Sequence, residues 1–332
     1  MKVLIATAMY PTEGNPAFGS FVRCQEIFLR RAGVDVDVLV LRGRYRKLIY
    51  PKGIFQLRQR LNDISLVHAH YAYVGLVARA QWQVPLVLTY HGDDALGTVT
   101  KEGSVSRKSR IVAAGCRKLA HYCDAVIVQS KRMAGKFQEE CVHVIPHEVD
   151  LDKFHPTNIN RAREQLGLSH SKNYVLFAAD PAIPVKNFPL ANAAAALLRT
   201  RTKDVELLVV CRETQERLAL YMSACDALVF PSYQEGSPNI IKQAMACNLP
   251  IVATDVGDVE EIIGRTRGCY ISQPNPEMFA RFLGTILASP FRTAGRDEVK
   301  HLSGELVADR LIQVYEEVLR RRYTNSLSSL RF

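Results

Sequence analysis

The chain has 332 residues, 48% of them hydrophobic and 23% charged, and carries a formal net charge of +10. This length favours two domains of roughly 150 residues each, and the ordinary globular composition excludes a disordered chain, a collagen-like repeat and a small disulfide scaffold. The positive charge favours anionic partners: nucleic acid, an anionic membrane surface or phosphorylated small molecules. It is concentrated in residues 1–150, which hold 21 basic and 13 acidic residues.

Short apolar segments alternate with helical patterns through the first half of the chain. Strands are predicted over residues 2–7, 34–39, 66–69, 86–90, 125–128 and 142–145. Helices are predicted between them, over 20–31, 54–62, 74–81, 108–121 and 131–139. Continuously apolar strands are typical of a parallel sheet covered by helices on both faces. Residues 1–150 are therefore predicted to form a doubly wound α/β domain.

The same alternation begins again after a polar stretch at 146–172, where we place the domain boundary. Strands are predicted over 174–177, 205–210, 227–230, 251–254 and 269–271, and helices over 161–165, 190–198, 215–223, 239–247, 259–263 and 277–288. They form a second α/β domain over 151–310. A last helix over 297–322 is long enough to pack back across both domains. Two such sheets in tandem leave a cleft, in which ligands bind beyond the carboxyl ends of the strands.

Neither the cysteines nor the acidic pairs predict a metal site. The eight cysteines form no C-x-x-C pair and none has zinc-ligand spacing with a histidine, so we expect reduced cysteines in the core. The pairs at 35/37 and 150/152 resemble a metal-binding D-x-D, but the first alternates along a strand and the second lies in the linker. The first apolar run is too short for a signal peptide, and no run of about 18 apolar residues occurs. We therefore expect a cytoplasmic protein without a metal or other cofactor.

The most informative segment is 230–257, which reads as a strand, a glycine turn, a helix and a second strand. Ser237 is a natural N-cap residue and Pro238 a natural first helical residue. A helix that begins here presents free backbone N–H groups and a positive dipole end, which suit a phosphate or a sugar hydroxyl. Gly236 would allow a ligand to approach the backbone closely.

Polar side chains of the same segment are placed to contact a ligand. Asn239 and Gln243 are four residues apart, so they share a line on the helix that can face the cleft. Glu235 precedes the helix, where its carboxylate could hold a sugar hydroxyl or interact with developing positive charge.

This segment resembles the nucleotide-sugar motif of the retaining GT-B glycosyltransferases of family 4, E-G-x-P followed by E-A-M/L-A. The resemblance implies that Glu235 contacts the donor sugar and that Gly236, Ser237, Pro238 and Asn239 meet the sugar and diphosphate. Gln243 stands where the family has a second glutamate that binds the ribose hydroxyls. An amide can still hydrogen-bond a diol, but it loses charge assistance of roughly 1 kcal/mol or more.

The resemblance extends over most of the chain. The segment 10–20 resembles the family's first glycine loop, which implies that Gly19 opens a helix near the donor phosphates. Residues 89–93, Thr-Tyr-His-Gly-Asp, resemble the T-x-H-G segment, whose histidine, here His91, reaches the donor sugar. His68 and His70 match a V-x-H-x-H strand end and are interpreted as structural. The fold implied is GT-B, two facing Rossmann-like domains with a cleft between them.

Two motifs depart from the family pattern. The P-N-G-V-D hinge reads Pro-His-Glu-Val-Asp at 146–150. The R-x-x-x-x-K diphosphate clamp reads Pro-Ala-Ile-Pro-Val-Lys at 181–186, so Lys186 is kept and the arginine is absent. Transferases of bacterial teichuronic acid, capsule and exopolysaccharide synthesis resemble this chain at the same place, so we interpret the departure as a subfamily feature.

Basic and aromatic residues interleave in the segment 41–61. A solvated loop would explain it, and so would an anionic membrane interface, which gains about 1 kcal/mol for each basic residue near its surface. Nucleic-acid binding is not predicted, because no recognition motif accompanies the charge.

The sequence thus predicts a retaining, metal-independent glycosyltransferase of the hexosyltransferase type, acting in cell-surface polysaccharide synthesis on a glycan or lipid-linked acceptor. The catalytic residues are predicted to be His91, Lys186 and Glu235, and closure about 146–150 would expel water. Two alternatives remain open: a nucleotide-sugar-binding protein with impaired catalysis, suggested by Gln243 and the missing arginine, and an epimerase or phosphorylase of similar fold.

Overall fold

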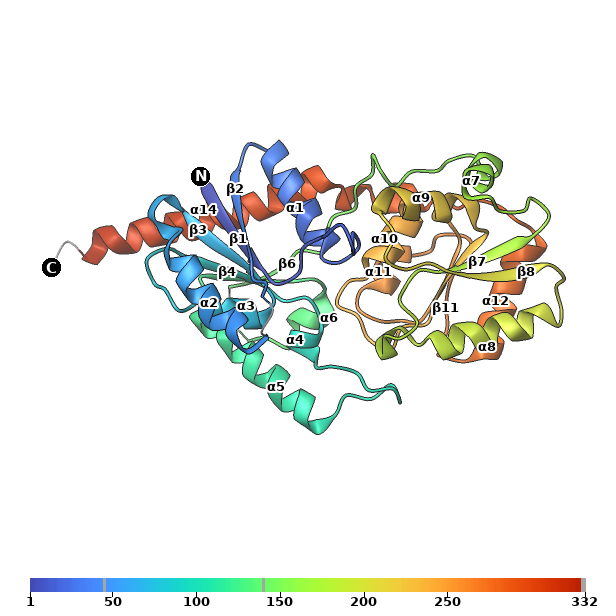
Figure 1. Cartoon of the computed structure of the whole chain (residues 1–332), viewed down its shortest axis with the longest axis horizontal. Helices are drawn as coiled ribbons and strands as arrows, with labels where there is room; N and C mark the ends of the chain where they lie inside the picture. Colours follow the sequence, from blue (N-terminus) through green and yellow to red (C-terminus); the bar gives the residue numbers. More distant parts are fainter. Residues whose placement is uncertain (44–45, 139–140, 330–332) are drawn as a thin grey trace.

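The computed structural model describes residues 1–43, 46–138 and 141–329, with the backbone alone at 46, 47 and 325–329. It has two α/β lobes side by side, and the last helix runs from one lobe along the other (Figure 1). Each lobe is a parallel sheet with helices on both faces. The fold class predicted from the alternating pattern is therefore confirmed.

The first lobe is built on a six-stranded parallel sheet in the order β2-β1-β3-β4-β5-β6. Its strands are β1 (Lys2–Thr7), β2 (Asp35–Val40), β3 (Leu66–His70), β4 (Leu86–Thr89), β5 (Ala125–Val128) and β6 (Val142–Val144). Its helices are α1 (Ser20–Arg31), α2 (Arg46–Arg58), η1 (Leu61–Asp63), α3 (Ala72–Ala78), α4 (Asp93–Leu96), α5 (Arg107–Arg117), η2 (Lys118–Tyr122) and α6 (Lys131–Ala134).

The second lobe has a five-stranded parallel sheet in the order β11-β10-β9-β7-β8. Its strands are β7 (Asn173–Phe177), β8 (Val205–Val209), β9 (Ala227–Phe230), β10 (Ile251–Ala253) and β11 (Cys269–Ile271). The remaining helices are α7 (Ile159–Leu166), η3 (Pro184–Lys186), α8 (Phe188–Arg199), α9 (Gln215–Ala224), α10 (Asn239–Ala246), α11 (Val259–Ile263), α12 (Pro276–Ala288), α13 (Gly295–Glu298), η4 (Lys300–Leu302) and α14 (Gly304–Ser329).

Both sheets reverse their winding at one place, between β1 and β3 in the first lobe and between β7 and β9 in the second. Connections leave such a pair of neighbouring strands toward opposite faces, so a crevice opens beyond their carboxyl ends. The loops that follow β1, β3, β7 and β9 lie at these crevices. These are the loops that carry most of the candidate site residues.

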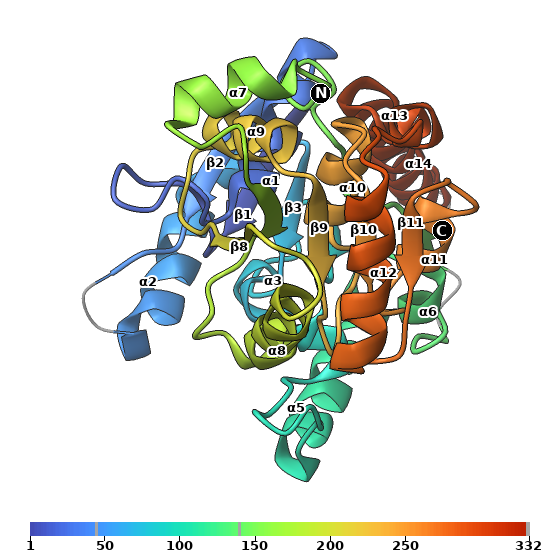
Figure 2. The same cartoon turned by 90° about the vertical axis from the view of Figure 1, so that its right-hand side faces the viewer.

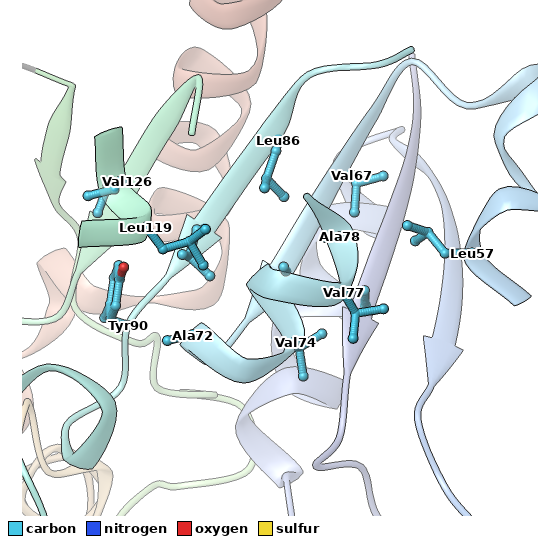
Figure 3. Packing of buried hydrophobic residues seen from close by; sticks show 14 of the residues in the cluster. Leu57, Val67, Ala72, Val74, Val77, Ala78, Leu86, Tyr90, Leu119 and Val126 are labelled. Atoms are coloured by element: carbon cyan, nitrogen blue, oxygen red, sulfur yellow. The ribbon is translucent and has the colours of Figure 1, made fainter. Parts of the chain in front are cut away.

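Apolar side chains cover both faces of each sheet. Along β1, Leu4 belongs to the cluster under α2 and α3, while Val3 and Ile5 belong to the cluster under α1 and α14. Figure 3 shows the first cluster, where Leu57 of α2 and Val74 and Val77 of α3 pack against the strands. In the second lobe α8 and α12 cover one face (Figure 2), and α9, α10 and α11 cover the other.

The chain crosses between the lobes twice, and the two crossings pair with each other. The Val149 N–H donates to the Leu302 carbonyl at 2.9 Å, beside a short parallel bridge between Val149 and Ser303. The single helix predicted over 297–322 is instead α13, η4 and α14, and it is α14 that packs along the first lobe. The hinge therefore consists of two paired segments.

Three helices of the first lobe differ from the sequence prediction. α2 begins at Arg46 rather than 54 and contains Pro51 in its interior. An interior proline disfavours a helix because it removes a backbone hydrogen bond and clashes with the preceding turn, which is why the sequence pattern placed the start of the helix after it. α6 ends at Ala134, and part of the helix predicted over 131–139 lies outside the described residues. The four-residue helix α4 was not predicted, since a single turn carries no periodic signal.

Gly304, the first residue of α14, provides a test of how this helix packs against α1. A Cβ atom there would lie 2.2 Å from the buried ring of Phe28. We expect Gly304→Ala to destabilise the protein by about 1–3 kcal/mol through overpacking. Gly115→Ala in α5, where a Cβ meets nothing within 4 Å, should instead stabilise by about 0.5–1 kcal/mol. Thermal unfolding of both variants measures the difference, and equal melting temperatures would contradict the packing.

Candidate active site

Two adjoining cavities lie in the cleft between the lobes. The first, here called the Lys186 cavity, has a volume of about 380 Å³, and its lining includes Tyr71, His91, His147, Lys186 and Glu235. The second, here called the Gln243 cavity, has a volume of about 410 Å³, and its lining includes Ser20, Cys24, Glu148, Gln215 and Gln243. They share Phe21 and Asn239. Residues from both lobes and from the hinge thus meet at one place.

Lys186 and Glu235 form an ion pair in the wall of the Lys186 cavity. The Lys186 Nζ atom lies 2.6 Å from Glu235 Oε1, and both side chains are largely buried. Their loops are held together because the Tyr233 N–H donates to the Val185 carbonyl at 2.9 Å. The structure therefore brings together a cation and a carboxylate that are 49 residues apart, in a position where a ligand could take over one or both partners.

The start of α10 differs from the prediction by one residue. The helix begins at Asn239 and Pro238 is its N-cap, with no side chain capping it. Ser237 is therefore not the N-cap, although it is buried beside the helix and lines the cavity. The fixed φ of proline suits either position, which explains why the sequence pattern misplaced the boundary. Pro238, Asn239 and Ile240 at the start of the helix line the Lys186 cavity.

Position 236 has to be glycine, because the opposite lobe leaves no room there for a side chain. A Cβ atom at this position would lie 2.6 Å from the carbonyl oxygen of His91. The two loops therefore touch backbone to backbone, one from each lobe.

Gly19, the N-cap of α1, has a φ of 71°, and a Cβ atom there would lie 2.3 Å from the backbone of Met9. Gly19 is not among the residues that line the Gln243 cavity, whereas Ser20, the next residue, is.

Four histidines form a connected cluster beneath the cleft. His91 Nε2 lies 3.1 Å from His70 Nδ1, and His91 Nδ1 lies 2.9 Å from Nε2 of His147 in the hinge. His68 Nδ1 faces the Tyr315 hydroxyl of α14 at 2.6 Å. Both ring nitrogens of His91 are thus engaged by other histidines in this conformation. Burial lowers the pKa of His70 to about 3 and the pKa of His91 and of His147 well below the usual value, so these rings are neutral.

Two residues that the sequence did not single out hold His91 in place. The buried Asp94 carboxylate accepts the N–H groups of His91 and Gly92 at 3.0 and 3.1 Å, and burial raises its pKa to about 6. Tyr71 stacks on the His91 ring at 4.4 Å between centroids. Its backbone has a φ of 73° and a ψ of 141°, a combination that costs energy for any residue with a side chain.

A fully buried lysine joins the hinge to α10. Lys242 Nζ donates to the His147 carbonyl at 2.7 Å and to Asn239 Oδ1 at 3.1 Å, and burial lowers its pKa to about 8. Glu148 is also buried, which raises the pKa of its carboxyl, although hydrogen bonds from its own backbone and from the Cys24 thiol act in the opposite direction. The only sign of these buried hinge contacts in the sequence was the His-Glu pair at 147–148, which stands where the family pattern has Asn-Gly.

Gln243 lies on the wall of its own cavity, one helical turn after Asn239. Its amide Nε2 donates to Gln215 Oε1 at 2.8 Å, and Gln215 in turn reaches Ser20 of the first lobe at 3.4 Å. This places the Gln243 amide between α10 and α9, at a polar contact that links the two lobes. The predicted line from Asn239 to Gln243 does face the cleft.

Within the described residues, no group of three or more His, Cys, Asp or Glu side chains is arranged to hold a metal ion. The same part of the chain contains no helix with the length and apolar character needed to cross a bilayer. None of the eight cysteines, all of which lie in the described part of the chain, forms a disulfide, and Cys211 is exposed rather than in the core.

Comparison with known proteins identifies the two halves of the chain. A model described as Glycosyltransferase Family 4 matches residues 9–153, and one described as Glycosyl transferases group 1 matches 192–289. The chain is 30% identical to a D-inositol 3-phosphate glycosyltransferase of Segniliparus rotundus, over 77% of this chain and 67% of that protein. It is 23% identical to the teichuronic acid biosynthesis glycosyltransferase TuaC of Bacillus subtilis, over 84% and 87% of the two chains.

Solved structures share the arrangement of both lobes. A sucrose-phosphate synthase from Thermosynechococcus elongatus matches with a TM-score of 0.78 at 21% identity, over 97% of this chain and all of that one. Anabaena HepE, solved with UDP and glucose, matches with a TM-score of 0.61 at 18% identity, over 99% and 100% of the two chains. Both parallel sheets and the facing lobes correspond to the GT-B fold predicted from the sequence. The chain therefore belongs to glycosyltransferase family 4 and is a GT-B glycosyltransferase.

Proposed function

We propose that the enzyme transfers a sugar from a nucleotide diphosphate sugar to a glycan or lipid-linked acceptor, with retention of configuration and without a metal ion, in cell-surface polysaccharide synthesis. The observation that carries the proposal is the Lys186–Glu235 pair beside the start of α10 in the interlobe cleft. The named roles of TuaC in teichuronic acid biosynthesis and the UDP and glucose bound to HepE support it.

The difficult step is departure of the nucleotide diphosphate. The bond between the anomeric carbon and the β-phosphate oxygen breaks, and negative charge grows on that oxygen while the sugar becomes oxocarbenium-like. Lys186 and the backbone N–H groups of Gly236, Ser237 and Asn239 stabilise this charge electrostatically. The acceptor oxygen then bonds to the anomeric carbon, and its proton passes to the departing phosphate.

The remaining residues hold the donor. Glu235 binds the sugar hydroxyls once the ligand phosphates compete for Lys186. Gln243 binds the ribose in its own cavity, close to the Ser20 end of α1. His91 contacts the sugar from the first lobe, and because both its nitrogens are engaged here, motion of His147 with the hinge has to release one. Closure of the lobes thereby assembles the site and excludes water.

The epimerase or phosphorylase alternative finds no support, whereas a protein that binds a donor without transferring its sugar is a second candidate. The specific observation in its favour is the amide of Gln243, which has no charge to bind a ribose diol and donates to Gln215 instead.

The proposed membrane contact involves α2 and α3. Leu48, Tyr50 and Phe55 of α2 and Tyr73 and Leu76 of α3 are exposed, and we call them the α2–α3 surface. The Tyr50 and Tyr73 rings lie 6.4 Å apart, so exposed side chains of the two helices are neighbours at this point. The lobe that carries them has the surplus positive charge, which complements an anionic membrane.

Some of the basic residues in the segment 41–61 already bind protein groups, so they are not free to bind lipid headgroups. Arg42 donates to the Tyr10 carbonyl, Arg58 to the Ala80 carbonyl at 2.7 Å, and Arg60 pairs with Asp37 at 3.3 Å. Arg44 lies outside the described residues, and the side chains of Arg46 and Lys47 are not described. Lys52 is exposed.

Substitution of the ion pair tests the site. Nucleotide sugars of UDP, GDP, ADP and dTDP are first screened by thermal shift, since a bound ligand raises the melting temperature. With the donor so found and EDTA present, we expect Lys186→Ala to lower kcat by about 100-fold or more, the usual effect of losing one oxyanion-stabilising group, and Glu235→Gln to abolish transfer.

The exposed Lys172–Glu206 pair, at 2.9 Å, provides matched controls: Lys172→Ala and Glu206→Gln should leave turnover unchanged. Near-normal turnover in both site variants would refute the assignment, and loss of transfer in EDTA that added Mg²⁺ restores would refute metal independence.

Gln243→Glu distinguishes the enzyme from the binding protein. We expect the carboxylate to tighten donor binding about 5- to 10-fold, the worth of roughly 1 kcal/mol of charge-assisted hydrogen bonding. Calorimetry measures the affinity, and the transfer assay is repeated on both forms. Absence of transfer by either form, with any donor that binds, would favour the binding protein.

Membrane docking is tested with vesicles. Wild-type protein should cosediment with vesicles of phosphatidylglycerol and not with phosphatidylcholine, and salt should weaken the binding because it screens the charge. The double variant Leu48→Ser/Phe55→Ser should bind less, whereas Leu306→Ser, an exposed leucine of α14, should bind as the wild type does. Equal binding to both lipids would exclude the electrostatic contact.

A further inference from the structure

A third cavity lies at the edge of the cleft, on the side of α4 and α5. It has a volume of about 330 Å³ and is lined by Ala95, Leu96, Arg110, Arg117, Lys136 and Gln234. We call it the basic cavity. Five of these residues come from the first lobe, around α4, α5 and α6 (Figure 1), and Gln234 comes from the second.

Three of the residues that line the basic cavity are cations. Among the residues that the structure describes, no carboxylate lines the cavity, and none forms an ion pair with Arg110, Arg117 or Lys136. Like charges around one small cavity repel each other, and an anion placed between them removes that cost. The cavity therefore has the electrostatic character of an anion site.

Backbone contacts hold two of these cations in place. The Arg110 Nε atom donates to the Val105 carbonyl at 3.1 Å, and the Arg117 guanidinium donates to the Ala95 carbonyl. Each guanidinium keeps further N–H groups for a ligand, in the fork geometry that matches a phosphate. Gln234 closes the second-lobe side, where its Nε2 donates to the Gly97 carbonyl at 2.7 Å.

The position of the basic cavity relates it to the reaction. Gln234 is the residue before Glu235, and Ala95 lies four residues after His91 in the chain. The donor diphosphate already has a place at Lys186 and the start of α10, so a second anion next to the sugar has to come from another molecule. The acceptor is the other molecule that the reaction brings there.

We propose that the basic cavity binds a phosphate or pyrophosphate group of the acceptor, an inference that rests on the proposed transferase function. The cavity then selects phosphorylated acceptors and orients them toward the sugar held by Glu235. Ile111 and Val112, next to Arg110 on α5, are exposed by 73% and 42%. They give a hydrocarbon chain attached to the phosphate an apolar surface on which to lie.

Binding of inorganic pyrophosphate tests the site without any turnover. Lys186→Ala removes the cation of the donor site, and calorimetry on that variant measures the remaining affinity. Adding Arg110→Gln and Lys136→Gln should weaken binding at least 10-fold. Adding Arg107→Gln and Lys108→Gln, two exposed cations of α5 that do not line the cavity, should leave it unchanged. Equal affinity in the two sets of variants would overturn the proposal.

The source of the phosphate is distinguished by a second probe. Farnesyl pyrophosphate should bind at least 10-fold more tightly than inorganic pyrophosphate if the natural acceptor is lipid-linked, and Ile111→Ser should remove the gain. Equal affinity for the two probes, both still dependent on Arg110 and Lys136, assigns a soluble phosphorylated acceptor.

Nucleotide binding separates this inference from the proposed function. The variant with wild-type Lys186 and both cavity substitutions should bind the donor nucleotide as tightly as the unaltered protein. If nucleotide binds and pyrophosphate binding ignores Arg110 and Lys136, the transferase proposal stands and the acceptor site is wrong. If no nucleotide binds to any form, the transferase proposal itself fails.

Discussion

The hydrogen bond between His91 and His147 connects the parts of the cleft that have to move relative to one another. His91 belongs to the first lobe, and His147 lies in the hinge with its Nε2 atom 2.9 Å from the His91 ring. The carbonyl of the same hinge residue accepts Lys242 of α10, which also holds Asn239 at the start of that helix. One continuous network of polar contacts therefore runs from His91 of the first lobe through the hinge to α10. A change of hinge angle cannot leave the His91 ring and the start of α10 both undisturbed.

Burial shifts the pKa values of the groups in this polar network. All the rings are neutral because desolvation lowers the pKa of each histidine, and the Lys242 pKa is lowered for the same reason. Neutral rings can share a proton in either direction, whereas a charged ring would need a buried counterion. Glu148 keeps its proton more readily than an exposed glutamate, because burial raises the pKa of its carboxyl. The hinge thus contains polar groups whose hydrogen bonds can be exchanged without creating an isolated charge.

The sequence predicted the frame of the site better than its internal contacts. β1, β5, β9 and β11 have the predicted bounds, because buried parallel strands between turns give a strong apolar signal. Lys186 and Glu235 could be named from a motif, and the structure places them 2.6 Å apart. The contact of His91 with His147 joins residues 56 apart in the chain, and no local periodicity encodes such a pair. Lys242 was hidden for another reason: a lysine on a helix is normally solvated, and only the fold shows that this one is buried.

The positive charge is distributed unequally between the two lobes. Glu235 already neutralises Lys186 within the second lobe, so under the proposed function this lobe needs little surplus charge to bind a diphosphate that replaces the carboxylate. Among the described residues, no carboxylate pairs with Arg110 or Arg117 of α5, and both donate to backbone carbonyls instead. Part of the positive charge of the first lobe is therefore left open at the basic cavity instead of being neutralised within the fold. If the proposed donor site and the inferred acceptor site are both correct, this distribution of charge lets the enzyme bind both of its substrates as anions.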